Sequence, residues 1–240
     1  MTAPIEVLRG AASVTLFLLF GLGALALSPL MLLLRRPEYA QPVIRTLWRP
    51  LLLMFEACGL VRVETDDFRG LGGTVLVANH PSLIDVVMLV VKVPRLMYVA
   101  KSALRSNPFL AAIVRATALP DGPDLPAAAA PYLARGWNVL IFPEGTRSPL
   151  DGPLHPFRRG AAQLALRTHS PITVVGLAFS RRLLAKRQSI ADMGDKPVKI
   201  HIRNLGTIDA PPHCGDYRAE AAVLTEELRR RLLEFTLRPA

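Results

Sequence analysis

A long stretch without charge near the amino terminus most constrains how this chain folds. No Asp, Glu, Lys or Arg occurs from Gly10 to Leu34, and Leu and Ala dominate the stretch. A helix of about 20 apolar residues is long enough to cross the hydrocarbon core of a bilayer. Gly21, Gly23 and Pro29 interrupt the stretch, so a kinked or half-inserted helix is also compatible with it. The sequence therefore predicts an amino-terminal membrane helix.

Basic residues follow this stretch, and a second apolar stretch comes after them. Arg35 and Arg36 come directly after Leu34, and residues 51–60 are again mostly apolar. This pattern predicts two helices joined by a basic turn, in a membrane-associated segment of residues 1–60. Because Lys and Arg are enriched on the cytoplasmic side of membrane helices, we expect the turn to stay with the cytoplasm and with anionic head groups.

Two other interpretations of the uncharged stretch stay open. A cleaved signal peptide usually has a shorter apolar core, and no A-x-A-like cleavage site precedes Arg35. A buried core helix of a water-soluble protein has the same apolar composition. The net charge of +10 favours anionic partners such as phospholipid head groups, nucleotide-bearing cofactors or nucleic acid. Charge alone does not choose among them, but the neighbouring apolar stretch favours a membrane.

After residue 60, short apolar runs alternate with helical patterns. We expect strands over 74–78, 96–100, 138–142, 172–179 and 198–202, and helices over 83–91, 109–116, 125–135, 158–167 and 216–237. Three prolines and a glycine predict a loop over 118–126. Strands that alternate with helices predict an α/β fold with a mostly parallel sheet flanked by helices. Residues 61–240 are therefore expected to form one α/β domain.

Cysteine spacing argues against covalent or metal cross-links. Cys58 and Cys214 are the two cysteines, and neither lies in a CxxC pair or beside a histidine cluster. We therefore expect two reduced thiols and no metal site.

A polar stretch of special interest, NHPSLID at residues 79–85, lies between a predicted strand and a predicted helix. Proline suits the first helical position, and the residue before a proline avoids helical backbone. With Pro81 starting the helix, His80 lies outside it and can fold back towards Asp85. A carboxylate that holds one ring nitrogen makes the other a base, which can take a proton from an alcohol without a covalent enzyme intermediate. The alternative is a surface histidine at a helix start, with Asp85 as a first-turn acid.

The stretch FPEGTRS, residues 142–148, follows another predicted strand at its carboxyl end, where parallel sheets bind ligands. Gly145 allows the backbone to approach a phosphate, and Arg147 offers a planar fork that matches phosphate oxygens. Glu144 is expected to hold Arg147 or the hydroxyls of an acceptor. The alternative is a charged turn with an internal Glu–Arg pair. Lys101, after the strand 96–100, and Arg159, at a helix start, are further cations that an anion would meet.

Together these two stretches resemble the lysophospholipid acyltransferase family, which includes the bacterial 1-acylglycerol-3-phosphate acyltransferases. The family's NHxSxxD motif is matched by residues 79–85, and its FPEGTRS motif by residues 142–148 without a change. The resemblance covers about residues 60–180 and implies a two-helix amino-terminal membrane element. It implies that His80 and Asp85 are catalytic. It also implies a set of acceptor-binding residues: Lys101, Glu144, Gly145, Thr146, Arg147 and Arg159.

The reaction implied by the resemblance is acyl transfer from acyl-CoA or acyl-carrier protein to the free hydroxyl of a lysophospholipid in the membrane. It implies no cofactor, no metal and no nucleic-acid partner. The expected location is a bacterial-type inner (cytoplasmic) membrane, with the active site facing the cytoplasm. The carrier of the donor, its chain length and the oligomeric state are left open.

Several positions depart from the family pattern. Ala111 and Ala112 stand where glycine is common, an expected arginine is absent from residues 120–124, and Val174 stands where a second proline is usual. These positions bind the acceptor in the family, so a specialised acceptor such as a lyso-ornithine lipid or a polyene lipid stays open.

Two hypotheses lie outside the family. A basic membrane-binding or nucleic-acid-binding protein would agree with the charge, but the chain has no RNP-like, helix-turn-helix or zinc signature. A His/Asp hydrolase would use similar residues, but the chain has no GxSxG serine and no metal-ligand cluster.

Overall fold

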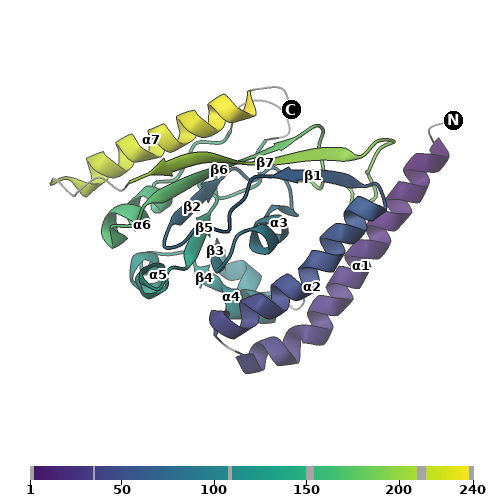
Figure 1. Ribbon diagram of the computed structural model, residues 1–240, viewed down its shortest axis with the longest axis horizontal. Helices are drawn as coiled ribbons and strands as arrows, with labels where there is room; N and C mark the ends of the chain where they lie inside the picture. The colour runs from purple at the N-terminus through teal and green to yellow at the C-terminus, as the bar shows by residue number, and fades with distance from the viewer. Residues whose placement is uncertain (1–2, 35, 108–109, 150–153, 210–214, 238–240) are drawn as a thin grey trace.

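One sheet lies between two layers of helices in the computed structural model, as Figure 1 shows. The structure describes residues 3–34, 36–107, 110–149, 154–209 and 215–237. Arg35, Cys214 and the first residue of the helix predicted over 109–116 lie outside this part of the chain.

The described strands form the sheet in the order β1-β7-β6-β2-β5-β3-β4. Their bounds are β1 (Val61–Thr65), β2 (Val75–Ala78), β3 (Leu96–Ala100), β4 (Ala118–Pro120), β5 (Asn138–Ile141), β6 (Ile172–Phe179) and β7 (Val198–Ile208). Parallel pairs join β6, β2, β5, β3 and β4, whereas β7 is antiparallel to β6 and parallel to β1. The carboxyl ends of β6, β2, β5 and β3 therefore meet at one edge of the sheet. The mostly parallel sheet predicted from the sequence is confirmed.

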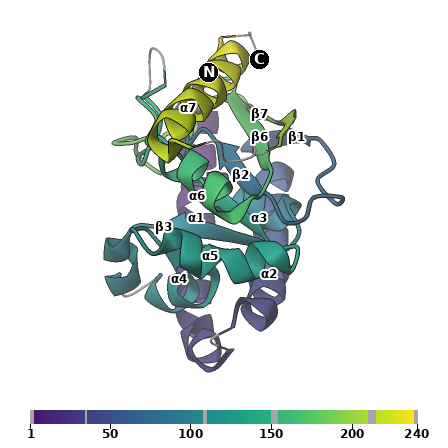
Figure 2. The same ribbon diagram turned by 90° about the vertical axis from the view of Figure 1, so that its left-hand side faces the viewer.

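The helices cover both faces of this sheet. Their bounds are α1 (Ala3–Leu34), α2 (Pro37–Ala57), α3 (Asp85–Lys92), the 3-10 helix η1 (Ser102–Ser106), α4 (Ala111–Thr117), α5 (Leu125–Ala134), α6 (Gly160–Thr168) and α7 (Tyr217–Thr236). Figures 1 and 2 show α1 to α4 on one face and α5 to α7 on the other.

Each strand in the middle of the sheet contributes to two hydrophobic cores. On β2, Leu76 and Ala78 belong to the core with α1 to α4, and Val75 and Val77 to the core with α5 to α7. Successive side chains of a strand point to opposite faces, so a strand covered on both faces must be apolar at every position. This requirement explains the unbroken VLVA sequence of β2.

The amino-terminal helices α1 and α2 run side by side in opposite directions (Figure 1). Helix α1 buries Leu16 and Met31 against the rest of the chain, while Leu18 and Leu22 stay 62% and 63% exposed. Within the described residues, Pro4–Leu34 is the one helix that is long and apolar enough to cross a membrane, and 17% of its most apolar window is buried. An interior helix of a soluble protein is mostly buried, so this exposure argues against that interpretation.

Several elements differ from the prediction made from the sequence. Residues 118–120 form strand β4 and not a loop, because Ala118 and Leu119 are buried beside β3. Pro120 is compatible with this edge position, where a missing N–H costs the sheet little. Strand β1 was not predicted. Strand β7 continues past residue 202 to Ile208 because this part of it pairs with β6, where Ile172 lies opposite Ile208. The second amino-terminal helix is also longer than its apolar part and starts at Pro37.

Candidate active site

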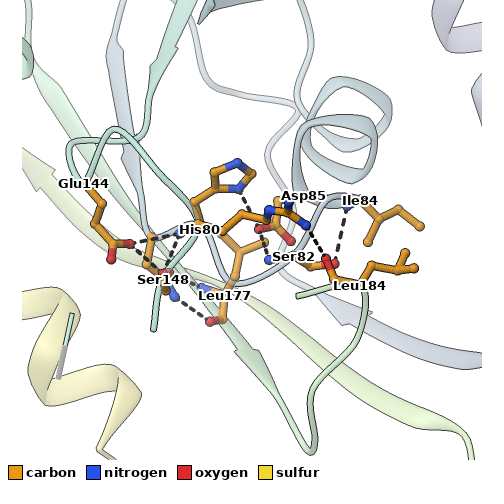
Figure 3. Close-up of polar contacts among 10 residues, drawn as sticks. His80, Ser82, Ile84, Asp85, Glu144, Ser148, Leu177 and Leu184 are labelled. Atoms are coloured by element: carbon orange, nitrogen blue, oxygen red, sulfur yellow. Dashed lines mark hydrogen bonds and ion pairs between the residues drawn. The ribbon is translucent and has the colours of Figure 1, made fainter. Parts of the chain in front are cut away.

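The carboxyl ends of β2, β5 and β6 bring the two polar stretches together (Figure 3). Asn79, directly after β2, donates through Nδ2 to the carbonyl of Leu177 and accepts its N–H through Oδ1, both at 2.8 Å. This amide fixes the end of β2 against β6. The Asn79 side chain therefore helps to set the position of His80. This role of Asn79 was not predicted from the sequence.

His80 and Asp85 form the expected contact, with 3.0 Å between His80 Nδ1 and Asp85 Oδ2. The backbone route differs from the prediction, because helix α3 begins at Asp85 and not at Pro81. Residues 81–84 form a turn that is closed by the Ser82 N–H, which donates to Asp85 Oδ2 at 2.8 Å. Side chains five residues apart can therefore meet because the intervening backbone is not helical.

Burial separates the two partners sharply. The side chain of Asp85 is fully buried, whereas that of His80 is 19% exposed. Burial raises the pKa of the Asp85 carboxyl, although the hydrogen bond from His80, the Ser82 N–H and the charge of Arg147 act in the opposite direction. Asp85 Oδ1 has no hydrogen-bond partner among the described residues.

The His80 ring is held on its face as well as at its edge. It stacks on Phe142, with 4.1 Å between the ring centroids and an interplanar angle of 18°. Asp85 holds Nδ1, and the described residues offer Nε2 no hydrogen-bond partner. A neutral imidazole that donates from Nδ1 has its free lone pair on Nε2, so Nε2 is the nitrogen that can accept a proton.

Glu144 lies beneath the backbone of His80 and does not pair with Arg147, which was one of the two partners considered for it from the sequence. Its Oε1 accepts from the His80 N–H at 3.3 Å and from the Ser148 hydroxyl at 2.6 Å, and its Oε2 accepts from the His155 N–H at 3.1 Å. Ser148 adds a backbone bond of 2.7 Å to the His80 carbonyl. The buried carboxylate of Glu144 thereby joins the two sequence stretches, as Figure 3 shows.

Arg147 is directed to the loop that follows β6. Its Nη1 donates to the Leu184 carbonyl at 2.9 Å, and the Leu83 N–H donates to the same carbonyl at 3.2 Å. This loop carries four basic residues over 181–187, but Leu183 and Leu184 between them are buried. The apolar pair between basic residues was the signal that would have placed the loop beside the site.

The remaining predicted binding residues lie around this centre at different distances. Gly145 has a φ of +64°, and a Cβ there would lie 3.0 Å from Nε of Arg158. Arg158, which was not among the predicted binding residues, is thus the arginine that lies over the turn. Thr146 is partly exposed in that turn, while Lys101 and Arg159 are exposed at the end of β3 and the start of α6. The structure shows no contact of Lys101 or Arg159 with His80 in the described part of the chain.

The profile of the acyltransferase family matches residues 60–180, about half of the chain. The chain belongs to the acyltransferase family. The matched region of this acyltransferase contains both His80 and Asp85 and the whole turn of residues 142–148.

Individual relatives agree with this family. A chloroplastic 1-acyl-sn-glycerol-3-phosphate acyltransferase of Brassica napus, BAT2, is 32% identical over 101 residues, which are 42% of this acyltransferase and 26% of the relative. A 1-acyl-sn-glycerol-3-phosphate acyltransferase of Cocos nucifera is 24% identical over 159 residues, 62% of this chain and 50% of its own. The match thus spans between a quarter and a half of the length of these relatives.

A solved structure extends the similarity in fold to nearly the whole acyltransferase. The 1-acyl-sn-glycerophosphate (LPA) acyltransferase PlsC from Thermotoga maritima superimposes with a TM-score of 0.68 over 99% of both chains, at 21% sequence identity. The arrangement of an amino-terminal helix pair in front of an α/β sheet is therefore a shared fold.

Proposed function

We propose that this acyltransferase moves a fatty acyl group from an acyl thioester to the free hydroxyl of a 1-acylglycerol-3-phosphate-like acceptor in phospholipid biosynthesis. The observation that carries the proposal is the bond between His80 Nδ1 and the buried carboxylate of Asp85, which leaves Nε2 directed away as a base. The thioester is either acyl-CoA or acyl-carrier protein. A thioester is already activated, so the chemistry requires no cofactor.

The residues act as a general acid–base pair in this reaction. His80 Nε2 takes the proton of the acceptor hydroxyl while the oxygen of that hydroxyl attacks the thioester carbonyl. The tetrahedral intermediate then collapses, the carbon–sulfur bond breaks, and the imidazolium returns the proton to the leaving thiolate. Asp85 stabilises the imidazolium and keeps the ring in one tautomer.

The acceptor is assigned from charge and from the relatives' names. Arg147 and Arg158 lie on or beside the turn of residues 144–148, and Lys101 follows β3, the strand next to β5. Cations at the carboxyl ends of parallel strands suit a phosphate. The relatives with the same motifs act, by their names, on 1-acyl-sn-glycerol-3-phosphate.

We further propose that residues 1–60 are the membrane-associated part and residues 61–240 the catalytic domain. The exposed apolar face of α1 supports this division. The inner (cytoplasmic) membrane, with His80 on the cytoplasmic side, is the location that agrees with the basic residues after α1.

A substitution at His80 tests the reaction. Release of free thiol from acyl-CoA or acyl-carrier protein in the presence of the lyso-acceptor should fall by about 10²–10⁴-fold in His80→Ala, because the general base is lost. His201→Ala is the matched control, since His201 lies on β7 and pairs with Glu64. Full activity of His80→Ala would contradict the mechanism.

A panel of acceptors tests the substrate class. Arg147→Gln should raise KM for phosphate-bearing acceptors and leave KM for the acyl donor nearly unchanged. Activity confined to acceptors without phosphate, such as a lyso-ornithine lipid, would instead favour the specialised alternative.

A further inference from the structure

A cavity away from His80 is the feature that the proposed reaction does not use. It has a volume of about 750 Å³ and lies between α2, the end of α3 and the segment that follows β1. Neither His80 nor Asp85 lines it. Helix α3 begins at Asp85 and ends at Lys92 in the cavity wall, so the two places are about 10 Å apart along this helix. Cavities of this size commonly hold small ligands.

Three cations line this cavity without an acidic partner in the part of the chain that the structure describes: Arg45, Arg49 and Lys92. Arg45 is fixed across the cavity by a 3.0 Å bond from Nη2 to the Val91 carbonyl, next to Lys92. Arg49 stands one helical turn after Arg45, a spacing at which like charges repel. Burial, and after it the charge of Arg49, lowers the pKa of Arg45.

Two of the three acids in the cavity wall are paired with arginines other than Arg45 and Arg49. Asp67 binds Arg69 at 2.8 Å, and Asp66 binds Arg203 at 3.0 Å. Glu56 accepts the backbone N–H of Val63 at 3.1 Å and keeps its negative charge, so the unpaired cations exceed the unpaired acids of the wall by two. The cavity therefore presents uncompensated positive charge beside Val91 and Lys92.

Apolar side chains form the rest of the wall. Leu52 and Leu53 line the cavity about one helical turn after Arg49 on α2. Phe68 lines it from the segment that follows β1. Helix α2 also packs against α1, the long apolar helix, as Figure 1 shows. A ligand with an anionic head and an apolar chain matches both parts of this wall, and a lipid phase beside α1 would supply it.

We propose that this cavity is an accessory site for the phosphate monoester head group of an anionic lipid, distinct from the catalytic site. Arg45, Arg49 and Lys92 bind the phosphate, and the acyl chain follows Leu52 and Leu53. Three cations match the double charge of a phosphate monoester better than the single charge of a phosphodiester. Such a site would retain the enzyme where phosphate-headed lipids are abundant.

The test is photolabelling of the full chain in phosphatidylcholine nanodiscs with a lysophosphatidate analogue that carries a diazirine in its acyl chain. Mass spectrometry of the peptides should find label in α2 or in residues 63–69. In Arg45→Gln/Arg49→Gln, label in these peptides should fall by about tenfold or more, because charge-assisted bonds to the phosphate are lost. Label in peptides beside His80 should persist, which separates this site from the proposed catalytic one.

Controls define what would overturn the proposal. Arg167→Gln/Arg218→Gln removes the same charge from exposed positions on α6 and α7 and should label like the wild type. Undiminished label in the Arg45/Arg49 variant, or equal labelling by a phosphocholine-headed probe, would refute a phosphate site. Dodecyl phosphate should compete for the site, and equally effective competition by inorganic phosphate would refute a lipid ligand.

A second variant keeps the test independent of the folding of α2. Lys92→Gln changes the opposite wall of the cavity and should also lower the label in α2. Normal labelling of Lys92→Gln together with an unfolded Arg45/Arg49 variant would also refute the site.

Discussion

Asp85 is a buried carboxylate whose burial opposes its charge. The pKa of its carboxyl is raised above the ordinary 3.8, with burial as the main cause. The folded state therefore binds the proton more tightly than the unfolded state does, so the ionised carboxylate lowers stability at neutral pH. The buried charge therefore does not stabilise the fold, but it accepts the hydrogen bond that orients the His80 ring.

This cost predicts a pH dependence that Asp85→Asn should remove. Between the raised pKa and 3.8, the wild type should gain stability relative to Asp85→Asn as the pH falls, by about 1.4 kcal/mol per unit of pKa shift. Denaturant unfolding of both proteins in detergent across this pH range measures the difference. A difference that stays constant with pH would show that burial does not raise this pKa.

Glu144 gives a prediction that separates positioning from acceptor binding. Its Oε1 accepts the backbone N–H of His80 and the Ser148 hydroxyl, and its Oε2 accepts the backbone N–H of His155, so an amide nitrogen at either position would face a donor. Glu144→Gln should lower kcat by about 10–100-fold through misplacement of His80, with little change in KM for the acceptor. Ser148→Ala, which removes one of the two side-chain acceptors of the His80 N–H, should have a smaller effect of the same kind. A raised KM with unchanged kcat would instead assign Glu144 to acceptor binding.

At the scale of elements, the turn between β2 and α3 decides the geometry of the site. Five residues separate His80 from Asp85, and a helix over this interval would point their side chains apart. The helix starts only at Asp85, and the Ser82 N–H closes the turn on the same oxygen that holds His80. Two hydrogen bonds keep this short segment in place. Asn79 bonds Leu177 on β6, and the His80 N–H donates to Glu144 in the turn after β5.

Helix α7 offers a contrasting case, because its stability should not affect catalysis. Asp216 caps α7, with Oδ1 accepting the N–H groups of Arg218 and Ala219 at 2.8 and 3.3 Å. Asp216→Ala should lower the free energy of unfolding by about 1 kcal/mol, whereas Asp216→Asn retains most of the cap. Thermal unfolding and an acyl-transfer assay of both variants check this. A loss of kcat in the Ala variant would link α7 to the site.

At the scale of the whole molecule, the helix pair α1 and α2 gives the protein two unlike sides. Helix α1 packs against α2 and α4 and turns a row of leucines outwards. The sheet, with the edge that holds His80 and Asp85, lies on the far side of α2 and α4 from the exposed face of α1 (Figure 1). A membrane on the exposed side of α1 would therefore leave the sheet outside the hydrocarbon region.

Charges on the exposed face of α1 should release the protein from lipid without unfolding it. Leu18 and Leu22 are both more than half exposed, so Leu18→Glu/Leu22→Glu leaves the packing of α1 intact. In flotation with phospholipid vesicles, this variant should shift largely to the unbound fraction, because charged residues are costly in the hydrocarbon core. Thr168→Glu/Thr207→Glu, placed away from α1, should float like the wild type. Unchanged flotation of the leucine variant would contradict membrane binding through α1.

Much of the fold followed from periodicity. The strands at 96–100 and 172–179 have the predicted bounds, because each is a mostly apolar run that both helix layers cover. The short strand β4 was missed since Pro120 and the two prolines that follow it dominate the local signal, and only its pairing with β3 makes it a strand. Strand β1 was missed because Val61 and Val63 alternate with charged residues in too short a segment to stand out.

The sequence by itself determined the α/β architecture, the apolar amino-terminal helix and the two stretches that hold the reactive groups. These features depend on local composition and spacing, which a sequence displays directly. Tertiary structure alone decided that Glu144 bonds the backbone of His80 and not Arg147, that Arg147 is directed to Leu184, and that Arg158 lies over Gly145. Each of these contacts depends on which strand ends become neighbours and on the path of a loop. No local pattern encodes them, because partners far apart in sequence meet only when the sheet assembles.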